Sequence, residues 1–181
     1  MNFVQPIRDP EVISRIKKDL IQLPSPRNYI LFVAGINTGL RISDILQLRI
    51  RDLKKKELYM TEIKTGKQKT FEMNPTVRRE LLSLVEARDE DEFLIVSRQG
   101  INKPITRNMA YKILRSLGER YKLQGIGTHS LRKTYGYFFY KQTGDIAMLQ
   151  KIFNHSDPAF TLRYIGIVQD TINAATRSFR V

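Results

Sequence analysis

The sequence of 181 residues contains no cysteine, no tryptophan and only two histidines, and it has 18 acidic residues against 31 Lys and Arg. The absence of cysteine excludes a disulfide framework, a thiolate metal site and a cysteine nucleophile. No apolar run approaches the roughly 18 residues that a membrane-spanning helix needs. The N-terminus also lacks the basic stretch followed by an apolar one that is typical of a secretory signal. We therefore expect a cytoplasmic protein with no membrane partner.

The scarcity of acidic residues leaves a formal net charge of +13 and a pI near 10.1. Such an excess of one sign repels itself within a compact fold, so a polyanionic partner is the economical explanation. Basic residues recur along the whole chain, as at Lys54–Lys56 and Lys64–Lys69. No segment combines a basic face with the strong apolar moment of a membrane-surface helix. The composition therefore favours nucleic acid as the partner.

The hydrophobic pattern predicts an α+β fold that is mostly helical, with a small antiparallel β-hairpin or sheet. It indicates helices over residues 11–23, 106–123 and 128–142, with Met109 facing inward, and further helices that begin after Ser25-Pro26, Asn74-Pro75, Asp145 and Asp157-Pro158. Residues 58–63 and 68–73 are rich in strand formers, and residues 64–67 between them are typical of a hairpin turn. Residues 93–96 form either a strand or a buried connector.

Six polar side chains stand in apolar or glycine-marked contexts: Arg41, Lys64, His129, Arg132, His155 and Tyr164. Each alone has an ordinary structural explanation, but together they suit attack of a phenolic oxygen on a phosphodiester. Arginine binds phosphate oxygens with planar, bidentate hydrogen bonds, and a lysine or histidine can protonate the leaving 5′ oxygen. A tyrosine nucleophile keeps the bond energy in a covalent phosphodiester, so that rejoining needs no ATP. The chain has neither a Gly-rich nucleotide loop nor an obvious carboxylate cluster for metal ions, and we expect no cofactor and no metal.

Four motifs, in order along the chain, carry a resemblance to a known family. They are Thr-Gly-Leu-Arg-Ile-Ser-Asp at residues 38–44, Ile-Lys-Thr-Gly-Lys at 63–67, Thr-His-Ser-Leu-Arg-Lys-Thr at 128–134, and Asn-His-Ser-Asp at 154–157 followed by Thr-Leu-Arg-Tyr at 161–164. The chain closely resembles the catalytic domain of the tyrosine site-specific recombinases, the phage integrase family, from about its first predicted helix to Tyr164. Lys133 and Asn154 depart from the residues that are common in the family at those positions.

The resemblance implies a role for each motif residue. By it, Arg41 and Arg132 clamp the scissile phosphate, and His155 donates a third hydrogen bond to its oxygens. Lys64 acts as the general acid on the 5′ oxygen, and His129 assists proton transfer at the tyrosine. Tyr164 becomes linked to the 3′ phosphate of the DNA, and Asp44 orients its neighbours rather than reacting.

The domain organisation follows from where the motifs fall. Only about 40 residues precede Arg41, so we expect one catalytic domain over residues 1–181 and no separate N-terminal domain that closes around the duplex, in either a compact stand-alone recombinase or a fragment of a longer one. Apolar residues line one side of the tail at residues 165–181. This tail either packs on its own domain or docks on a neighbouring protomer.

The predicted function is therefore site-specific recombination of double-stranded DNA, with integration, excision or inversion as its outcome and neither metal nor ATP required. The resemblance implies a homo-tetramer on paired DNA sites, a monomer or dimer free in solution, accessory DNA-bending or directionality factors, a nucleoid-associated location and an origin in a mobile element or phage. Two alternatives stay open: a catalytically silent DNA-binding regulator of the same fold, and a relaxase similar to the type IB topoisomerases.

Overall fold

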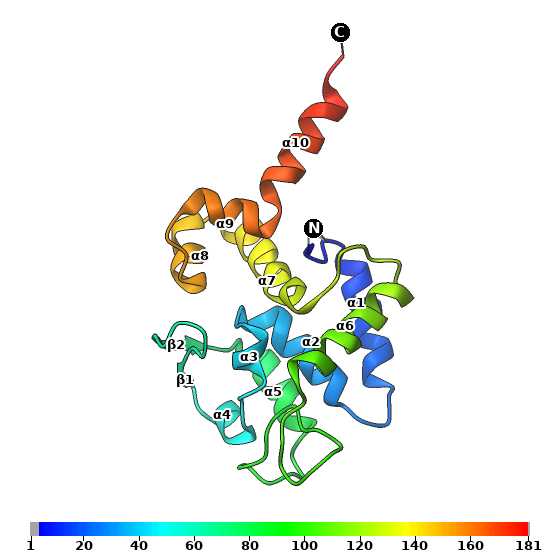
Figure 1. Ribbon diagram of the computed structural model, residues 1–181, viewed down its shortest axis with the longest axis vertical. Helices are drawn as coiled ribbons and strands as arrows, with labels where there is room; N and C mark the ends of the chain where they lie inside the picture. Colours follow the sequence, from blue (N-terminus) through cyan, green and yellow to red (C-terminus); the bar gives the residue numbers. More distant parts are fainter. Residues whose placement is uncertain (1–3, 181) are drawn as a thin grey trace.

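The computed structural model describes residues 4–180, which form ten helices and one two-stranded antiparallel sheet. Figure 1 shows their arrangement. In chain order the elements are α1 (Pro10–Ile21), α2 (Arg27–Thr38), α3 (Ile42–Ile45), α4 (Ile50–Lys54), β1 (Glu57–Thr61), β2 (Gln68–Glu72), α5 (Pro75–Ser83), α6 (Arg107–Arg120), α7 (Thr128–Thr143), α8 (Ile146–Phe153), α9 (Pro158–Ile165) and α10 (Ile167–Ser178). The predicted mostly helical α+β fold is confirmed.

Several helices begin where local side-chain chemistry predicts a start. Asp9, Asn74 and Asp157 each precede a proline in the first helical turn, and each side chain accepts hydrogen bonds from the backbone N–H groups that follow. Proline suits this position because the first N–H groups of a helix have no partner within the helix. Asp145 caps α8 in the same manner without a proline.

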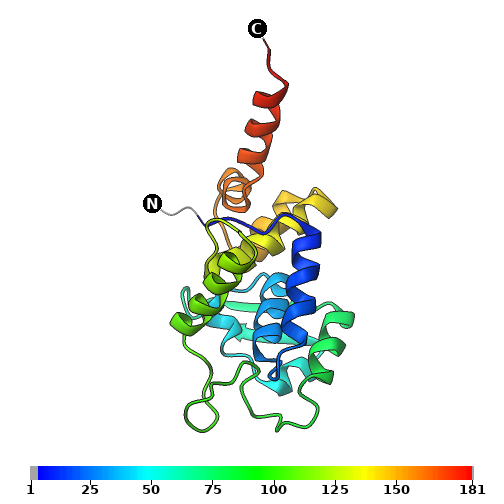
Figure 2. The same cartoon turned by 90° about the vertical axis from the view of Figure 1, so that its right-hand side faces the viewer.

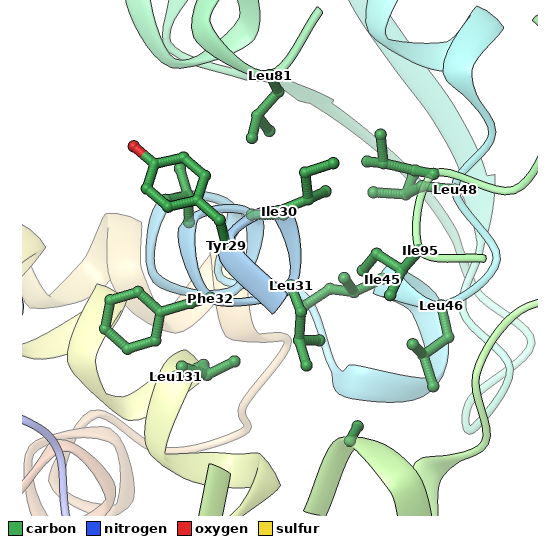
Figure 3. Close-up of a cluster of buried hydrophobic side chains, with 14 of the residues drawn as sticks. Tyr29, Ile30, Leu31, Phe32, Ile45, Leu46, Leu48, Leu81, Ile95 and Leu131 are labelled. Carbon is green, nitrogen blue, oxygen red and sulfur yellow. The ribbon is translucent and has the colours of Figure 1, made fainter. Parts of the chain in front are cut away.

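Helix α2 lies at the centre of the main hydrophobic core, as Figure 3 shows. Ile30, Leu31 and Phe32 are buried on successive sides of this helix, which is typical of a helix that other elements surround. Helix α7 crosses α2 closely at Gly35, where a Cβ atom would stand 2.3 Å from the Leu131 side chain. This contact places the predicted His129–Arg132 motif of α7 beside the C-terminal end of α2.

The predicted hairpin is confirmed, with Leu58 of β1 opposite Phe71 of β2. The stretch at 93–96 is a buried connector, since only the isolated bridges Arg49–Phe93 and Val96–Pro104 involve it. Helix α4 was not predicted. The prediction that Met109 faces inward is wrong. Its side chain is exposed, because α6 turns Ala110 and Leu114 to the core.

A second, smaller hydrophobic cluster, here called the C-terminal cluster, consists of Leu149, Phe153 and Ile165. It joins α8 and α9 to the outer face of α7. From there α10 projects away from the rest of the molecule, as both ribbon views show (Figures 1 and 2). Within the described part of α10 no residue is buried, and Val168 and Ile172 are exposed.

The segment before α1 lies across α7. The N–H of Ile7 donates to Thr134 Oγ1 at 2.8 Å, and Lys133 Nζ donates to the carbonyl of Val4 at 2.7 Å. Arg8 forms an ion pair of 3.0 Å with Asp170 of α10. Residues 4–8 therefore connect the core to the base of the C-terminal helix. Among residues 4–180, no helix is both long and apolar enough to cross a bilayer.

Candidate active site

Arg41 lies at the turn between α2 and α3. Gly39 ends α2 in the left-handed conformation with φ of 63°, and a Cβ atom there would stand 2.6 Å from the Tyr135 ring. Arg41 Nη1 lies 2.6 Å from Glu62 Oε1, and the Glu62 side chain is only 1% exposed. The buried Asp44 carboxylate accepts from the N–H of Ile63 at 3.1 Å. Two buried carboxylates thus hold the arginine turn against the hairpin.

Arg132 is buried on α7 and connects this turn to the C-terminal cluster. Its guanidinium donates to the carbonyl of Gly39 at 2.5 Å and to the carbonyl of Phe153 at 2.8 Å. The guanidinium carbon also lies 4.3 Å from the centre of the Phe153 ring. A guanidinium has five N–H donors in a fixed plane, so two backbone contacts fix its orientation and leave it able to bind an anion as well.

His155 follows the C-terminal end of α8, where Asn154 adopts a left-handed conformation with φ of 54°. The Thr161 hydroxyl donates to the carbonyl of Asp157, and its oxygen lies 3.1 Å from His155 Nδ1. A hydroxyl has one hydrogen. While that hydrogen is on the Asp157 carbonyl, His155 Nδ1 donates to Thr161, and Nε2 of the neutral ring carries no proton. Burial and the charges of Arg132 and Arg41 lower the pKa of His155 to about 4.

The phenol of Tyr164 lies in the same site. Its hydroxyl is 3.2 Å from His129 Nδ1, and its ring packs edge-on against Phe153 and His155. Burial raises the pKa of Tyr164, although the charges of Arg132 and other nearby groups act in the opposite direction. Burial and neighbouring cations lower the pKa of His129, which makes it neutral at pH 7 and able to accept a proton.

Lys64 lies at the rim of this site, in the turn of the hairpin, with its side chain exposed. Its charge contributes to the lowered pKa of His129. Five of the six predicted residues therefore converge, and the sixth stands within electrostatic reach of them.

Three further residues belong to the site and were not predicted. Lys69 of β2 is half-buried with Nζ 2.6 Å from the carbonyl of Ile152, Glu62 pairs with Arg41, and Thr161 orients His155. The alternation of strand residues offered a signal for two of them. Glu62 follows Leu58 and Met60, and Lys69 precedes Phe71, at a spacing of two that puts each on the inward side.

The buried and half-buried charges of the site leave an excess of positive charge. Arg41, Arg132, Lys69 and Lys133 are cationic, while Asp44 and Glu62 are anionic, and Lys133 Nζ lies 4.9 Å from the centre of the Tyr164 ring. The sum is +2, which a phosphodiester charge would reduce. Across residues 4–180 there is no group of three or more His, Asp or Glu side chains placed to hold a metal ion.

Comparisons with known proteins agree with this geometry. The profile of the phage integrase family matches residues 10–169. A probable integrase/recombinase of Bacillus subtilis (strain 168), YoeC, is 46% identical over 180 residues, which cover 99% of this chain and 98% of that protein. The tyrosine recombinase XerH of Campylobacter jejuni is 25% identical over 158 residues, and the match covers 83% of this chain but only 44% of XerH.

Solved structures share the fold. The XerA recombinase superposes with a TM-score of 0.71 at 20% identity, over 98% of this chain and 65% of XerA. The catalytic domain of bacteriophage HP1 integrase superposes with a TM-score of 0.64 at 19% identity, over 96% of this chain and 95% of that domain. The family profile, the Bacillus subtilis relative and the arrangement of the four motifs show that the chain belongs to the phage integrase family and is a tyrosine recombinase.

Proposed function

We propose that Tyr164 cleaves and rejoins duplex DNA at specific sites by forming a 3′-phosphotyrosyl bond. The observation that carries this proposal is the placement of the Tyr164 hydroxyl 3.2 Å from the neutral His129, beside two arginines. A phenol whose pKa is raised by burial needs a base when it attacks, and His129 is the group within reach.

The proposed cleavage step is an in-line displacement at phosphorus. The Tyr164 oxygen bonds to phosphorus while its proton passes to His129 Nδ1. The bond between phosphorus and the 5′ oxygen breaks, and Lys64 donates a proton to that oxygen. Rejoining is the reverse step with a 5′ hydroxyl as the nucleophile. The phosphodiester bond energy is conserved throughout, so no nucleotide is consumed.

The phosphate is bound in this proposal by Arg41, Arg132 and His155. Both arginines are already oriented, Arg41 by Glu62 and Arg132 by two backbone carbonyls. Donors that are fixed before the reaction stabilise charge that develops in the transition state without reorganisation, and removal of one typically lowers the rate about 100- to 1000-fold.

Double-stranded DNA is the proposed partner because of charge and position. The exposed cations Lys64 and Arg107 lie within electrostatic reach of His129, and the whole chain carries a net charge of +13. A solved structure with a similar fold, the XerH recombinase bound to its palindromic difH substrate in a post-cleavage complex, superposes on this chain with a TM-score of 0.68 at 17% identity. We expect binding that weakens steeply with salt, since counterions are released from the phosphates, and a location on the nucleoid.

We propose further that residues 1–181 act as one catalytic domain and that four copies assemble on two DNA sites. The exposed apolar residues of the tail, Val168 and Ile172 on α10 and Phe179 just after it, support docking on a neighbouring protomer. Truncation after Gly166 is expected to abolish pairing of two sites while leaving binding to one site. Unchanged pairing and cleavage by the truncated chain would exclude this role of α10.

The function is tested with duplexes that the protein selects from a randomised pool and with the repeats that flank its own coding region. Each duplex is nicked beside the candidate cleavage position, so that the released fragment diffuses away and the covalent complex accumulates. Tyr164→Phe is expected to bind these duplexes and to form no covalent complex. Binding without any complex in the unaltered chain would favour the silent regulator, and relaxation of any supercoiled plasmid would favour the topoisomerase-like alternative.

A further inference from the structure

The four carbonyls at the C-terminal end of α8 have an unusual set of partners. The carbonyls of Gln150 and Lys151 accept from the backbone of Asn154, and Gln150 also accepts from the N–H of His155. The last two carbonyls of the helix instead face cations of other elements. Because these carbonyls have no partner within the helix and form the negative end of its dipole, cations stabilise them.

One of these two cations, Lys69, has no role in the cleavage step proposed above. Arg132 binds the carbonyl of Phe153 at 2.8 Å, and Lys69 binds the carbonyl of Ile152 at 2.6 Å. Arg132 belongs to the phosphate site, whereas Lys69 comes from β2, 83 residues away from its partner along the chain. Two cations of different elements therefore bind the adjacent carbonyls of Ile152 and Phe153, and only Asn154 separates these residues from His155.

The hairpin that carries Lys69 is attached on two sides. On one side Glu62 pairs with Arg41, and the N–H of Ile63 donates to Asp44. On the other side Lys69 reaches the end of α8. Lys64 lies in the turn of the hairpin, next to Ile63. The direction of the turn thus depends on both attachments, and the second links the hairpin to the end of α8.

The electrostatic surroundings agree with an internal role for Lys69. Burial and the charge of Arg132 lower the pKa of Lys69 to about 8, with Glu62 and Asp44 acting in the opposite direction. Lys67, by comparison, reaches Asn154 Oδ1 at 3.2 Å from an exposed position on the same hairpin. Lys67 therefore provides a matched control: a lysine two residues away, with a similar partner, but outside the site.

We propose that Lys69 is a positioning residue, which fixes the β1–β2 hairpin against the end of α8 and thereby sets both Lys64 and His155 relative to the scissile phosphate. This inference rests on the proposed role of Lys64 as the proton donor. Lys69 itself transfers no proton in it.

The test uses the nicked duplex on which the unaltered chain forms its covalent complex, and a second duplex in which sulfur replaces the bridging 5′ oxygen. A thiolate leaves without protonation, so sulfur rescues loss of the proton that Lys64 donates, but it does not rescue misplacement of His155. Lys69→Met is expected to slow single-turnover cleavage about 10- to 100-fold on both duplexes. Lys69→Arg should restore the rate to within several-fold, and Lys67→Met should stay within about threefold of the unaltered chain.

Two results would overturn the proposal: full rescue of Lys69→Met by sulfur, which would assign the whole effect to proton donation and none to His155, or an unchanged rate on both duplexes. Lys64→Ala is measured in parallel, and its failure to recover on sulfur would contradict the proposed function rather than the role of Lys69. Hydrogen exchange of the free protein gives a readout without DNA. Residues 62–72 are expected to exchange faster in Lys69→Met than in Lys67→Met, and equal exchange would contradict the inference. If Lys69→Met does not fold, Lys69→Gln replaces it in both measurements.

Discussion

Binding of the scissile phosphate is expected to protonate His155. When the Thr161 hydroxyl donates to Asp157, it accepts from His155 Nδ1, and neutral His155 then has no hydrogen on Nε2 to offer a phosphate oxygen. Its pKa is about 4, against an ordinary value of 6.5, because burial and two arginines disfavour the imidazolium. A phosphate between these groups offsets the arginine charges, so the pKa of His155 rises on binding.

The magnitude follows from the two pKa values. Suppose that binding restores the pKa of His155 to its ordinary value of 6.5. At pH 6.0 the ring is then about 1% protonated in the free protein and about 75% protonated in the complex, so binding takes up about 0.75 proton. Since the bound state holds the extra proton, affinity increases as pH falls, by about 20-fold between pH 7 and pH 5.

Calorimetry in two buffers of different ionisation enthalpy measures this uptake directly. The Tyr164→Phe chain is used so that no cleavage occurs, and His155→Gln in the same background removes the titrating ring. The double variant is expected to lose the uptake at pH 6.0 and most of the pH dependence of binding. Equal proton uptake with and without His155 would refute the reasoning.

Three further predictions concern stability and charge. Arg132→Met should lower the free energy of unfolding by about 3–5 kcal/mol, because it leaves the buried carbonyls of Gly39 and Phe153 unpaired; a loss below about 1 kcal/mol in urea unfolding would contradict this. Gly136→Ala should cost about 1 kcal/mol in the same assay despite the better helix propensity of alanine, since the new methyl would stand 2.7 Å from the Phe153 ring, and a stabilised variant would show that the ring can move. Glu62→Gln should bind duplex about fivefold more tightly by fluorescence anisotropy, because it removes a negative charge from the phosphate site; unchanged affinity would mean that Glu62 does not face the bound phosphate.

Local chemistry explains what could be predicted from the sequence. Asp9, Asn74 and Asp157 specify helix starts through hydrogen bonds to N–H groups two or three residues away, so their effect is independent of the rest of the fold. The hairpin was predictable for the same reason, because its turn and strand formers lie within 16 residues. The four motifs were identified by resemblance to a family, and their convergence is a property of the folded chain.

Long-range packing explains what could not be predicted. The burial of Lys69 depends on α8, which lies 83 residues further along the chain, and a lysine in a hairpin is usually solvated. The apolar side of the tail at residues 165–181 was visible in the sequence. An apolar helix face does not, however, specify which surface it packs against. Met109 stood one residue away from the true inward face of α6, a difference of about 100° around a helix.

The segment at residues 4–8 has a practical consequence for handling the protein. Val4 and Ile7 form hydrogen bonds with α7, and Arg8 forms an ion pair with the base of α10, so this segment connects α7 to the helix that follows Tyr164. A purification tag, a fluorophore or a fused domain joined ahead of residue 4 would disturb the contacts of residues 4–8 with α7 and α10. Labels for single-molecule work are therefore better attached at the acidic loop of residues 89–92, which lies far from Tyr164 along the chain and contacts neither α7 nor α10 through any hydrogen bond between described residues.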